Sequence, residues 1–215
     1  MNAKAAIFSL GIMLISLSAK AQNSAQEELN YTKTLDQRAS RILNTMQIGD
    51  SLKYHKVKGL IVDQYRALNA IHEDEKKQVA AIDKETDKNI VEAKRKSIEE
   101  ATSRQLAPLH DAYLNKLAAE LTSEQVNAVK DGMTFNVLSV TTKAYQDMIP
   151  SLTAEEKGQI NSWLVEAREL AMDAGSSEDK HRIFGKYKGR INNYLAKRGY
   201  DLQKERAAWN ARSKR

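Results

Sequence analysis

The sequence predicts an all-α protein, an irregular helical bundle with a long charged helix or a helical hairpin. Apolar residues recur at spacings of three and four along most of the chain, which is the period of an amphipathic helix. Capping boxes, the Ser/Thr-x-x-Glu/Gln pattern that starts helices, precede several of these segments. The 215 residues include only 2 Pro and 9 Gly, so turn signals are too few for an all-β sandwich or barrel.

Residues 1–21 predict a signal peptide that is cleaved on export. Lys4 precedes the apolar stretch 5–18, and Ala19-Lys20-Ala21 fits the small-x-small cleavage pattern. A retained N-terminal anchor is the alternative, but the apolar stretch is shorter than the roughly 20 residues that span a bilayer. We expect the mature chain, 22–215, to be a single helical domain in the periplasm or outside the cell, with no transmembrane segment after cleavage.

Cysteine is absent from the whole sequence. This excludes a disulfide scaffold, a thiol nucleophile, a thiolate metal site and a lipoprotein anchor. An exported chain without disulfides must be held together by packing alone.

The first part of the mature chain, 22–120, predicts long helices. A capping box at Ser24-x-x-Glu27 starts one helix, which Gly49 ends, and Asp50 is placed to cap the next. An apolar stripe over 57–71 continues that second helix.

Beyond this stripe the charge pattern changes. Between Glu73 and Arg104, large apolar residues are sparse and acids alternate with bases, which is typical of a long exposed helix. Pro108 predicts a kink or a restart of the helix. His72 stands beside three acids and is predicted to be a surface histidine. Whether 50–120 forms one long hairpin or several shorter helices is left open.

The second part, 121–210, predicts shorter helices. Capping boxes at Thr122 and Thr153 start two of them, and Leu121 and Val126 are spaced for a hydrophobic staple. The segment 135–148 contains strand-favouring residues, but its flanks favour a short helix or an irregular turn.

The end of the chain contains two further helix boundaries. Gly175 ends one helix and Ser176 or Ser177 starts the next, which Gly199 ends before Asp201 caps a last helix. We expect five to seven helices in one bundle-like domain with a projecting hairpin.

Positive charge is concentrated at the C-terminal end. Residues 182–215 contain 11 Lys and Arg against two acids, whereas the whole chain has 34 against 28. On the helix predicted over 177–198, the basic residues share one side within about 80° of arc, away from the apolar face. Gly185 and Gly189 lie close to that side, where a missing side chain lets a ligand approach the backbone.

These residue types predict a site for an anionic or polyhydroxylated ligand. Arg and Lys bind carboxylates, Asn bonds to hydroxyls, and a Tyr ring can cover a sugar face. The alternative is a solvated basic surface that pairs with acids of the same domain. The candidate ligand-binding residues are Arg182, Lys186, Tyr187, Arg190, Asn193 and Tyr194.

Other functions find less support in the sequence. The four histidines stand in no metal-ligand spacing, and the chain has no nucleophile elbow and no phosphate-binding glycine loop. We therefore predict no catalytic residue, no metal site, no cofactor and no enzyme, the alternative being an enzyme whose site only tertiary structure assembles. Nucleic acid is not expected as a partner of an exported chain without a recognised nucleic-acid motif.

Several runs in the C-terminal half resemble a known family. They are Met133-Thr134-Phe135, Tyr145-x-x-Met148-Ile149-Pro150-x-Leu152-Thr153, Glu166-Ala167-Arg168-Glu169-x-Ala171-Met172-Asp173-Ala174, and Phe184-Gly185-Lys186-Tyr187-Lys188-Gly189-Arg190-Ile191-Asn192-Asn193-Tyr194-Leu195 with Gly199-Tyr200-Asp201-Leu202. They resemble an uncharacterised family of exported bacterial helical proteins, a domain of unknown function that is labelled as sugar-binding. The resemblance implies carbohydrate binding and assigns no residue to it.

A second resemblance concerns two pentapeptides. Leu121-Thr122-x-x-Gln125 is similar to the LTxxQ motif of periplasmic helical chaperones, and Leu152-Thr153-x-x-Glu156 departs from it by Glu for Gln. It implies a cupped helical homodimer that holds unfolded clients. We therefore predict a protein that binds carbohydrate, including acidic glycans, with a periplasmic chaperone or stress adaptor as the alternative.

Overall fold

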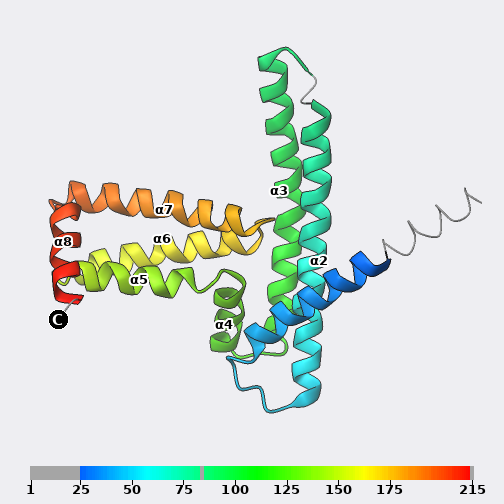
Figure 1. The fold of residues 1–215 in the computed structure, drawn as a ribbon, viewed down its shortest axis with the longest axis horizontal. Helices are drawn as coiled ribbons and strands as arrows, with labels where there is room; N and C mark the ends of the chain where they lie inside the picture. Colours follow the sequence, from blue (N-terminus) through cyan, green and yellow to red (C-terminus); the bar gives the residue numbers. More distant parts are fainter. Residues whose placement is uncertain (1–24, 83–84, 214–215) are drawn as a thin grey trace, which may run out of the picture.

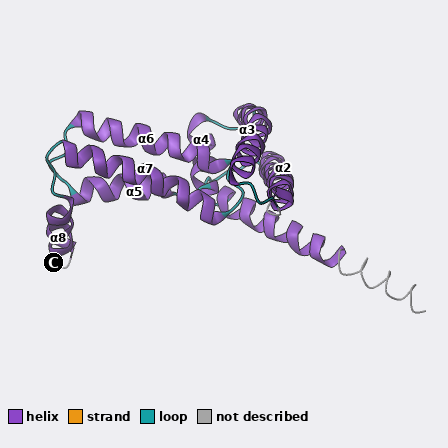
Figure 2. Cartoon of the chain, turned by 90° about the horizontal axis from the view of Figure 1, so that it is seen from above, coloured by secondary structure: helices purple, strands orange, loops and turns teal. Residues whose placement is uncertain are grey.

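A computed structural model describes residues 25–82 and 85–213, and in this part of the chain it contains 8 helices and no strand (Figures 1 and 2). The predicted all-α class is confirmed. The number of helices exceeds the predicted five to seven, because the charged segment is divided between two helices. The predicted signal peptide, 1–21, and Ser24 of the first capping box lie outside the described residues.

The helices follow one another with short connections. The first covers residues 25–43 and is called the N-terminal helix. The others are α2 (Ser51–Ile82), α3 (Lys88–Ala118), α4 (Ser123–Met133), α5 (Val137–Met148), α6 (Ala154–Met172), α7 (Ser177–Lys197) and α8 (Leu202–Ser213). None of the helices described is both long enough and apolar enough to cross a membrane.

Two long helices, α2 and α3, lie side by side as an antiparallel hairpin (Figure 1). The N-terminal helix crosses the hairpin near its base, and α4 lies beside the same region. We call α5–α8 the arm, which extends from this region roughly at right angles to the hairpin, with α8 at its far end (Figures 1 and 2).

Two hydrophobic clusters divide the molecule. The first joins the N-terminal helix, the hairpin and α4, and its fully buried side chains include Leu43, Ile61, Leu117 and Met133. The second fills the arm, with Phe184, Ile191 and Leu195 of α7 packed among side chains of α5 and α6. Residues 121–133 therefore pack with the first part of the chain, although they follow its last long helix.

The hairpin turn corrects one expectation. The charged segment between Glu73 and Arg104 is not one helix, because α2 ends at Ile82 and α3 begins at Lys88. Asp87 caps α3 by accepting hydrogen bonds from the backbone N–H groups of Asn89 and Ile90. The hairpin alternative is thus confirmed.

The prediction that the helix restarts at Pro108 is also corrected. The helix α3 runs through Pro108 without a restart. Its place on an exposed part of α3 leaves the helix free to continue past it, although proline removes one backbone hydrogen bond.

The predicted helix starts are confirmed wherever the structure describes them. Thr122 and Thr153 each form a complete capping box, and Ser176 caps α7 through the backbone N–H of Asp179. Asp50 and Asp201 accept hydrogen bonds from backbone N–H groups two and three residues ahead. Helix capping therefore accounts for the sequences of both LTxxQ-like pentapeptides.

The ambiguous segment 135–148 is helical over α5, after an unusual turn. Phe135 and Asn136 have φ values of 58° and 57°, in the left-handed region that residues other than glycine adopt at a cost. The turn changes the direction of the chain between α4 and α5 (Figure 1). It brings α5 alongside α6, in the arm.

Candidate functional site

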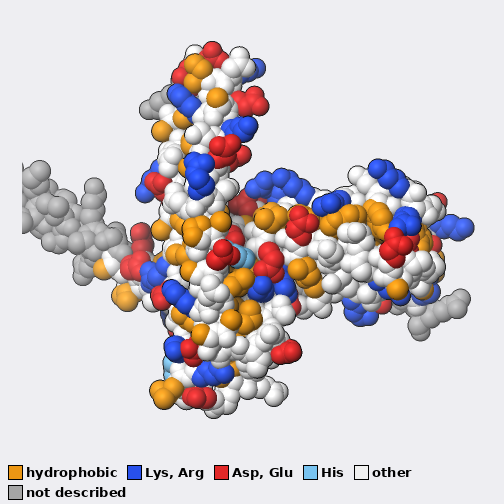
Figure 3. Space-filling view, turned by 180° about the vertical axis from the view of Figure 1, so that it is seen from behind, with side chains coloured by type: hydrophobic (Ala, Val, Ile, Leu, Met, Phe, Trp, Pro, Cys, Tyr) orange, Lys and Arg blue, Asp and Glu red, His pale blue; other side chains and the backbone are white. Residues whose placement is uncertain are grey.

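The basic face predicted on α7 lies on the outside of the arm. Figure 3 shows Lys and Arg side chains gathered along the upper edge of the arm, where α7 runs. The opposite face of α7 is anchored by Phe184, Ile191 and Leu195, which are fully buried. The amphipathic pattern thus fixes the rotation of the helix and turns its basic residues to solvent.

Four of the six candidate residues come together around one shallow hollow of about 610 Å³. They are Lys186, Arg190, Asn193 and Tyr194. The remaining lining residues are Trp163 of α6 with Gly189 and Lys197 of α7. We call this the α6–α7 hollow.

Aromatic and charged groups are in contact in the hollow. The guanidinium of Arg190 lies 4.5 Å from the centre of the Trp163 ring, and the Trp163 and Tyr194 rings meet edge to face at 5.2 Å. Arg190 Nη1 is also 3.7 Å from Glu166 Oε2, with both side chains more than half exposed. This ion pair is weak because water screens it, so Arg190 remains accessible to a ligand.

The other two candidates lie outside the hollow. Arg182 pairs with Asp179 of its own helix at 2.6 Å. Tyr187 packs against the arm cluster. Burial and the neighbouring Glu166 raise the pKa of Tyr187 to about 12. The sequence shows which side of α7 these two residues share with the others. It does not show that α6 packs beside only part of that side.

The glycines of α7 have no packing role in the described structure. A Cβ atom at Gly185 or Gly189 would meet nothing within 4 Å. Only Gly189 lines the hollow. A glycine inside a helix lowers helix stability relative to alanine. At Gly189 this loss of stability accompanies an open approach to the backbone.

A second polar cluster, which we call the junction cluster, lies where the hairpin and α4 meet α6. Arg168 is only 6% exposed. Its guanidinium contacts Asp131 and Asn127 of α4, each at 2.9 Å, and Glu169 at 3.1 Å. Lys130 Nζ donates to the same Glu169 carboxylate at 2.7 Å. These contacts connect α4 to α6.

Two histidines extend the junction cluster to the hairpin. His110 Nδ1 lies 2.8 Å from Asp173 Oδ2 and His110 Nε2 lies 3.6 Å from Glu169 Oε2. His72 Nε2 donates to the backbone carbonyl of Asp173 at 2.7 Å, and its other ring nitrogen contacts Glu75. The prediction that His72 is a surface histidine is wrong, since its side chain is 14% exposed.

The pKa values in the junction cluster move in opposite directions. The contacts with Asp173 and Glu169 outweigh burial and raise the pKa of His110 to about 9. Burial alone would raise the pKa of Glu169. However, hydrogen bonds from His110 and Lys130, together with nearby positive charge, lower it to about 2. Both groups are therefore ionised at neutral pH and hold each other in place.

The junction cluster also explains one glycine. A Cβ atom at Gly175 would lie 2.6 Å from the ring of His72. The turn between α6 and α7 therefore passes directly against α2, and only glycine fits there. Among the described residues, no group of three or more His, Asp and Glu is arranged to hold a metal ion.

Sequence reasoning missed Trp163 as a site residue and missed the whole junction cluster. The spacing of Trp163 with other apolar residues predicts only a place on the packed face of its helix, and nothing local indicates its contacts with Arg190 and Tyr194 of α7. The run Glu166–Ala174 contains Arg168 and Glu169 in α6 and Asp173 at its C-cap, beside residues of the apolar face. Charges at core-facing positions were the available signal for a buried polar cluster.

A family model matches most of the chain. The family model described as "Protein of unknown function (DUF3826)" matches residues 32–215. The match covers the hairpin, the junction cluster and the arm. No curated protein matches the chain.

Proposed function

The chain belongs to the DUF3826 family of proteins of unknown function, and we propose that it is an exported, non-enzymatic protein that binds carbohydrate in the α6–α7 hollow. The observation that supports this most is the convergence of Trp163 with Lys186, Arg190 and Asn193 around one opening. Aromatic rings pack against the apolar face of a sugar, while amide and cationic groups bond to hydroxyls and carboxylates.

The residue types favour an acidic glycan over a neutral one. Lys186, Arg190 and Lys197 supply three positive charges, and the lining residues described for the hollow include no carboxylate. Glycoside hydrolysis ordinarily uses a pair of carboxylates around the scissile bond. A site of this composition suits retention of a uronic-acid glycan better than its hydrolysis.

The binding test is calorimetry with two probes of equal length. We expect an oligomer of galacturonic acid to bind the mature protein more tightly than a neutral oligomer of glucose. The paired substitutions Lys186→Ala and Arg190→Ala should weaken binding by about tenfold or more, since each removes a charge-assisted hydrogen bond. Wild-type protein that binds neither oligomer contradicts the proposed function.

A matched control removes the same charge from the same helix. Arg182 and Lys188 are exposed on α7 and do not line the hollow. The paired substitutions Arg182→Ala and Lys188→Ala should leave affinity for the galacturonate oligomer within about twofold of wild type, because distant exposed charges are screened. If both double variants lose affinity equally, the loss is an effect of net charge, and the hollow is not the binding site.

Export is tested separately. The full-length chain expressed in a Gram-negative host should be recovered from the periplasm or the medium with a new N-terminus near Gln22, because the first residues fit a cleavable signal. N-terminal sequencing measures this. An uncleaved chain retained in the cytoplasm contradicts the proposal.

A further inference from the structure

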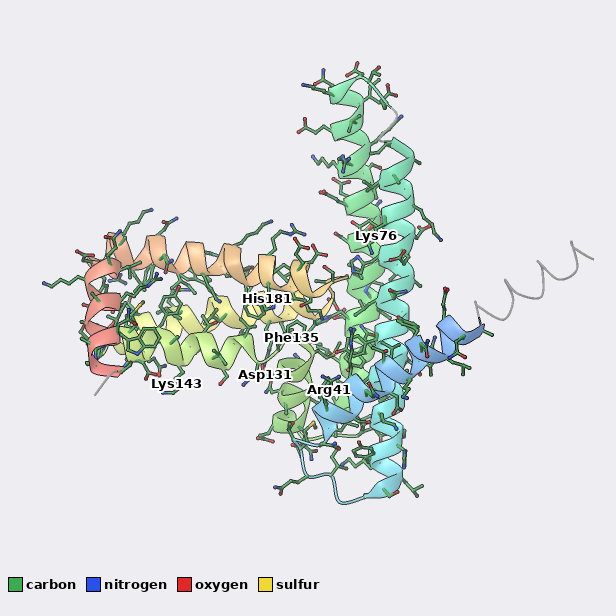
Figure 4. All side chains as sticks on the ribbon, in the orientation of Figure 1. Arg41, Lys76, Asp131, Phe135, Lys143 and His181 are labelled. Atoms are coloured by element: carbon green, nitrogen blue, oxygen red, sulfur yellow. The ribbon has the colours of Figure 1, made fainter. Side chains whose placement is uncertain are left out.

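A second and larger cavity lies at the base of the hairpin. It measures about 840 Å³, is open to solvent, and is lined by the N-terminal helix, α2, the end of α4 with its following turn, and the turn between α6 and α7 with the start of α7. Figure 4 labels Arg41, Asp131 and Phe135, which reach this region from the N-terminal helix and from α4 and its following turn. None of its described lining residues also lines the α6–α7 hollow. We call it the basic pocket.

Three cationic side chains line the basic pocket. Arg38 and Arg41 project from the N-terminal helix and form no ion pair within the described part of the chain. Lys180 is 6% exposed and donates to the backbone carbonyls of Met133 at 3.1 Å and Met172 at 3.5 Å. These two carbonyl oxygens accept from two of the three donors of the Lys180 ammonium and do not neutralise its charge.

The acidic group nearby does not balance this charge. Asp131 is the one acid among the described lining residues, and its carboxylate is bound by Arg168 at 2.9 Å. Burial lowers the pKa of Lys180 to about 8; Asp173 opposes this shift, and the positive charge of Arg38 adds to it. Burial is the main cause of the shift, because the effect of Asp173 is larger than that of Arg38. A buried ammonium with a perturbed pKa in a cavity is a candidate binding group for an anion.

The rest of the lining suits a compact polyhydroxylated molecule. Tyr31, Tyr65 and Phe135 provide aromatic surface, and hydroxyl and amide side chains lie between them, from Thr34, Asn69, Asn136, Ser176 and Ser177. The left-handed backbone of Phe135 and Asn136 holds the Phe135 ring half exposed at the pocket, where it stacks on His181 at 5.5 Å. Backbone strain of this kind concentrates at ligand-binding sites.

We propose that the basic pocket binds an acidic monosaccharide, a sugar that carries a carboxylate or a phosphate. The anionic group lies among Arg38, Arg41 and Lys180, and the sugar ring lies against the aromatic lining. The volume is within the range of small-molecule sites. This site is separate from the α6–α7 hollow and does not depend on the proposed function of that hollow.

Calorimetry with four probes tests the proposal: D-glucuronate, D-glucose 6-phosphate, inorganic phosphate and D-glucose. We expect one of the two acidic sugars to bind with a Kd of about 1 mM or lower, and D-glucose to bind at least about tenfold more weakly. Preference for glucuronate identifies the anionic group as a carboxylate, and preference for the phosphate ester identifies it as a phosphate. The proposal is overturned if neither acidic sugar binds. It is also overturned if D-glucose binds as tightly as the acidic sugars, or if inorganic phosphate binds as tightly as both of them.

Substitution places the binding in the pocket. Arg38→Gln with Arg41→Gln should weaken the bound acidic sugar by about tenfold or more, because both removed groups form charge-assisted hydrogen bonds. These side chains are exposed and without an ion pair among the described residues, so the thermal midpoint should stay near that of wild type. An unchanged affinity in this variant overturns the assignment.

Two controls separate this site from net charge and from the other proposal. Lys33→Gln with Lys88→Gln removes two exposed charges away from both sites and should leave the affinity unchanged. Lys186→Ala with Arg190→Ala should keep acidic-sugar binding in the pocket while losing glycan binding in the hollow. Loss of acidic-sugar binding in either control contradicts the basic pocket.

Discussion

At the scale of single residues, His110 and Glu169 show how strongly the junction cluster depends on charge. The pKa of His110 is raised to about 9 and that of Glu169 is lowered to about 2. Their side chains are 16% and 29% exposed, so the solvent screens the contacts only in part. Each group stabilises the fold only while it is ionised.

The first prediction follows from the sign of the His110 shift. Because the folded pKa lies above the ordinary value of 6.5, the stabilisation is fully present below pH 6.5 and is lost as pH rises through about 9. We expect His110→Gln to lower the free energy of unfolding by about 2 kcal/mol at pH 6 and by much less at pH 10. Urea denaturation at both pH values measures this. An equal loss at both would contradict the assigned charge.

Glu169 limits stability on the acid side. Its folded pKa lies below the ordinary value, so its contribution is present above pH 4.5 and is lost as pH falls through about 2. The stabilising contributions of His110 and Glu169 are therefore both fully present between about pH 4.5 and 6.5.

The second prediction concerns the buried guanidinium of Arg168. Arg168→Met removes the partner of Asp131 and leaves that carboxylate without its cation, which should cost about 3 kcal/mol of stability. Adding Asp131→Asn should recover part of this loss, because the uncompensated charge disappears with it. Chemical denaturation of the two single variants and the double variant gives the coupling energy. The exposed Arg104→Met serves as the control and should be close to neutral.

At the scale of secondary-structure elements, α7 combines a firmly packed face with a weakened one. Its apolar face is fully buried, yet Gly185 and Gly189 interrupt its solvent face with no neighbour that excludes a side chain. Sequence spacing alone placed these glycines near the basic residues. Why they lie there could be judged only once the structure showed the space around them to be open.

The third prediction uses this open space. Gly189→Ala should raise the free energy of unfolding by about 0.5 to 1 kcal/mol, since alanine is the better helix former and its Cβ meets no atom. Under the proposed function, the same change lowers affinity for the galacturonate oligomer. Gly185→Ala is the matched control, because it should stabilise α7 equally and leave affinity unchanged. Thermal denaturation and calorimetry on both variants measure the two effects.

At the scale of the whole molecule, the two hydrophobic clusters leave the outer hairpin without a core. Among the described residues between 69 and 101, none is buried. His72 still ties α2 to the junction cluster, but beyond it the two helices meet along a narrow seam. Local stability should therefore fall toward the hairpin turn.

The fourth prediction is a gradient of hydrogen exchange along the hairpin. Backbone amides near Ile61 and Leu117 should be protected to nearly the level of global unfolding, since both side chains are fully buried. Amides over 76–82 and 88–98 should exchange at least about tenfold faster, through local opening. Mass spectrometry of exchanged peptides measures this gradient. Uniform protection along the whole hairpin contradicts the account of the two clusters.

The sequence by itself determined the helical class, the helix starts at Asp50, Thr122, Thr153, Ser176 and Asp201, and the rotation of α7. Each of these depends on residues within a few positions of one another: a capping side chain, an apolar stripe, or a glycine after a helix. Such local signals keep their meaning whatever the rest of the chain does.

Only the tertiary structure decided which distant residues meet. The contacts of Trp163 with Arg190 and of His110 with Asp173 join segments that are apart in sequence, and the basic pocket is lined by both the N-terminal helix and the turn before α7. Helix spacing fixes which face a residue occupies, and it carries no information about which other helix covers that face. Which helices meet is decided by the packing of the two hydrophobic clusters. The hollow, the junction cluster and the basic pocket form because that packing brings their residues together.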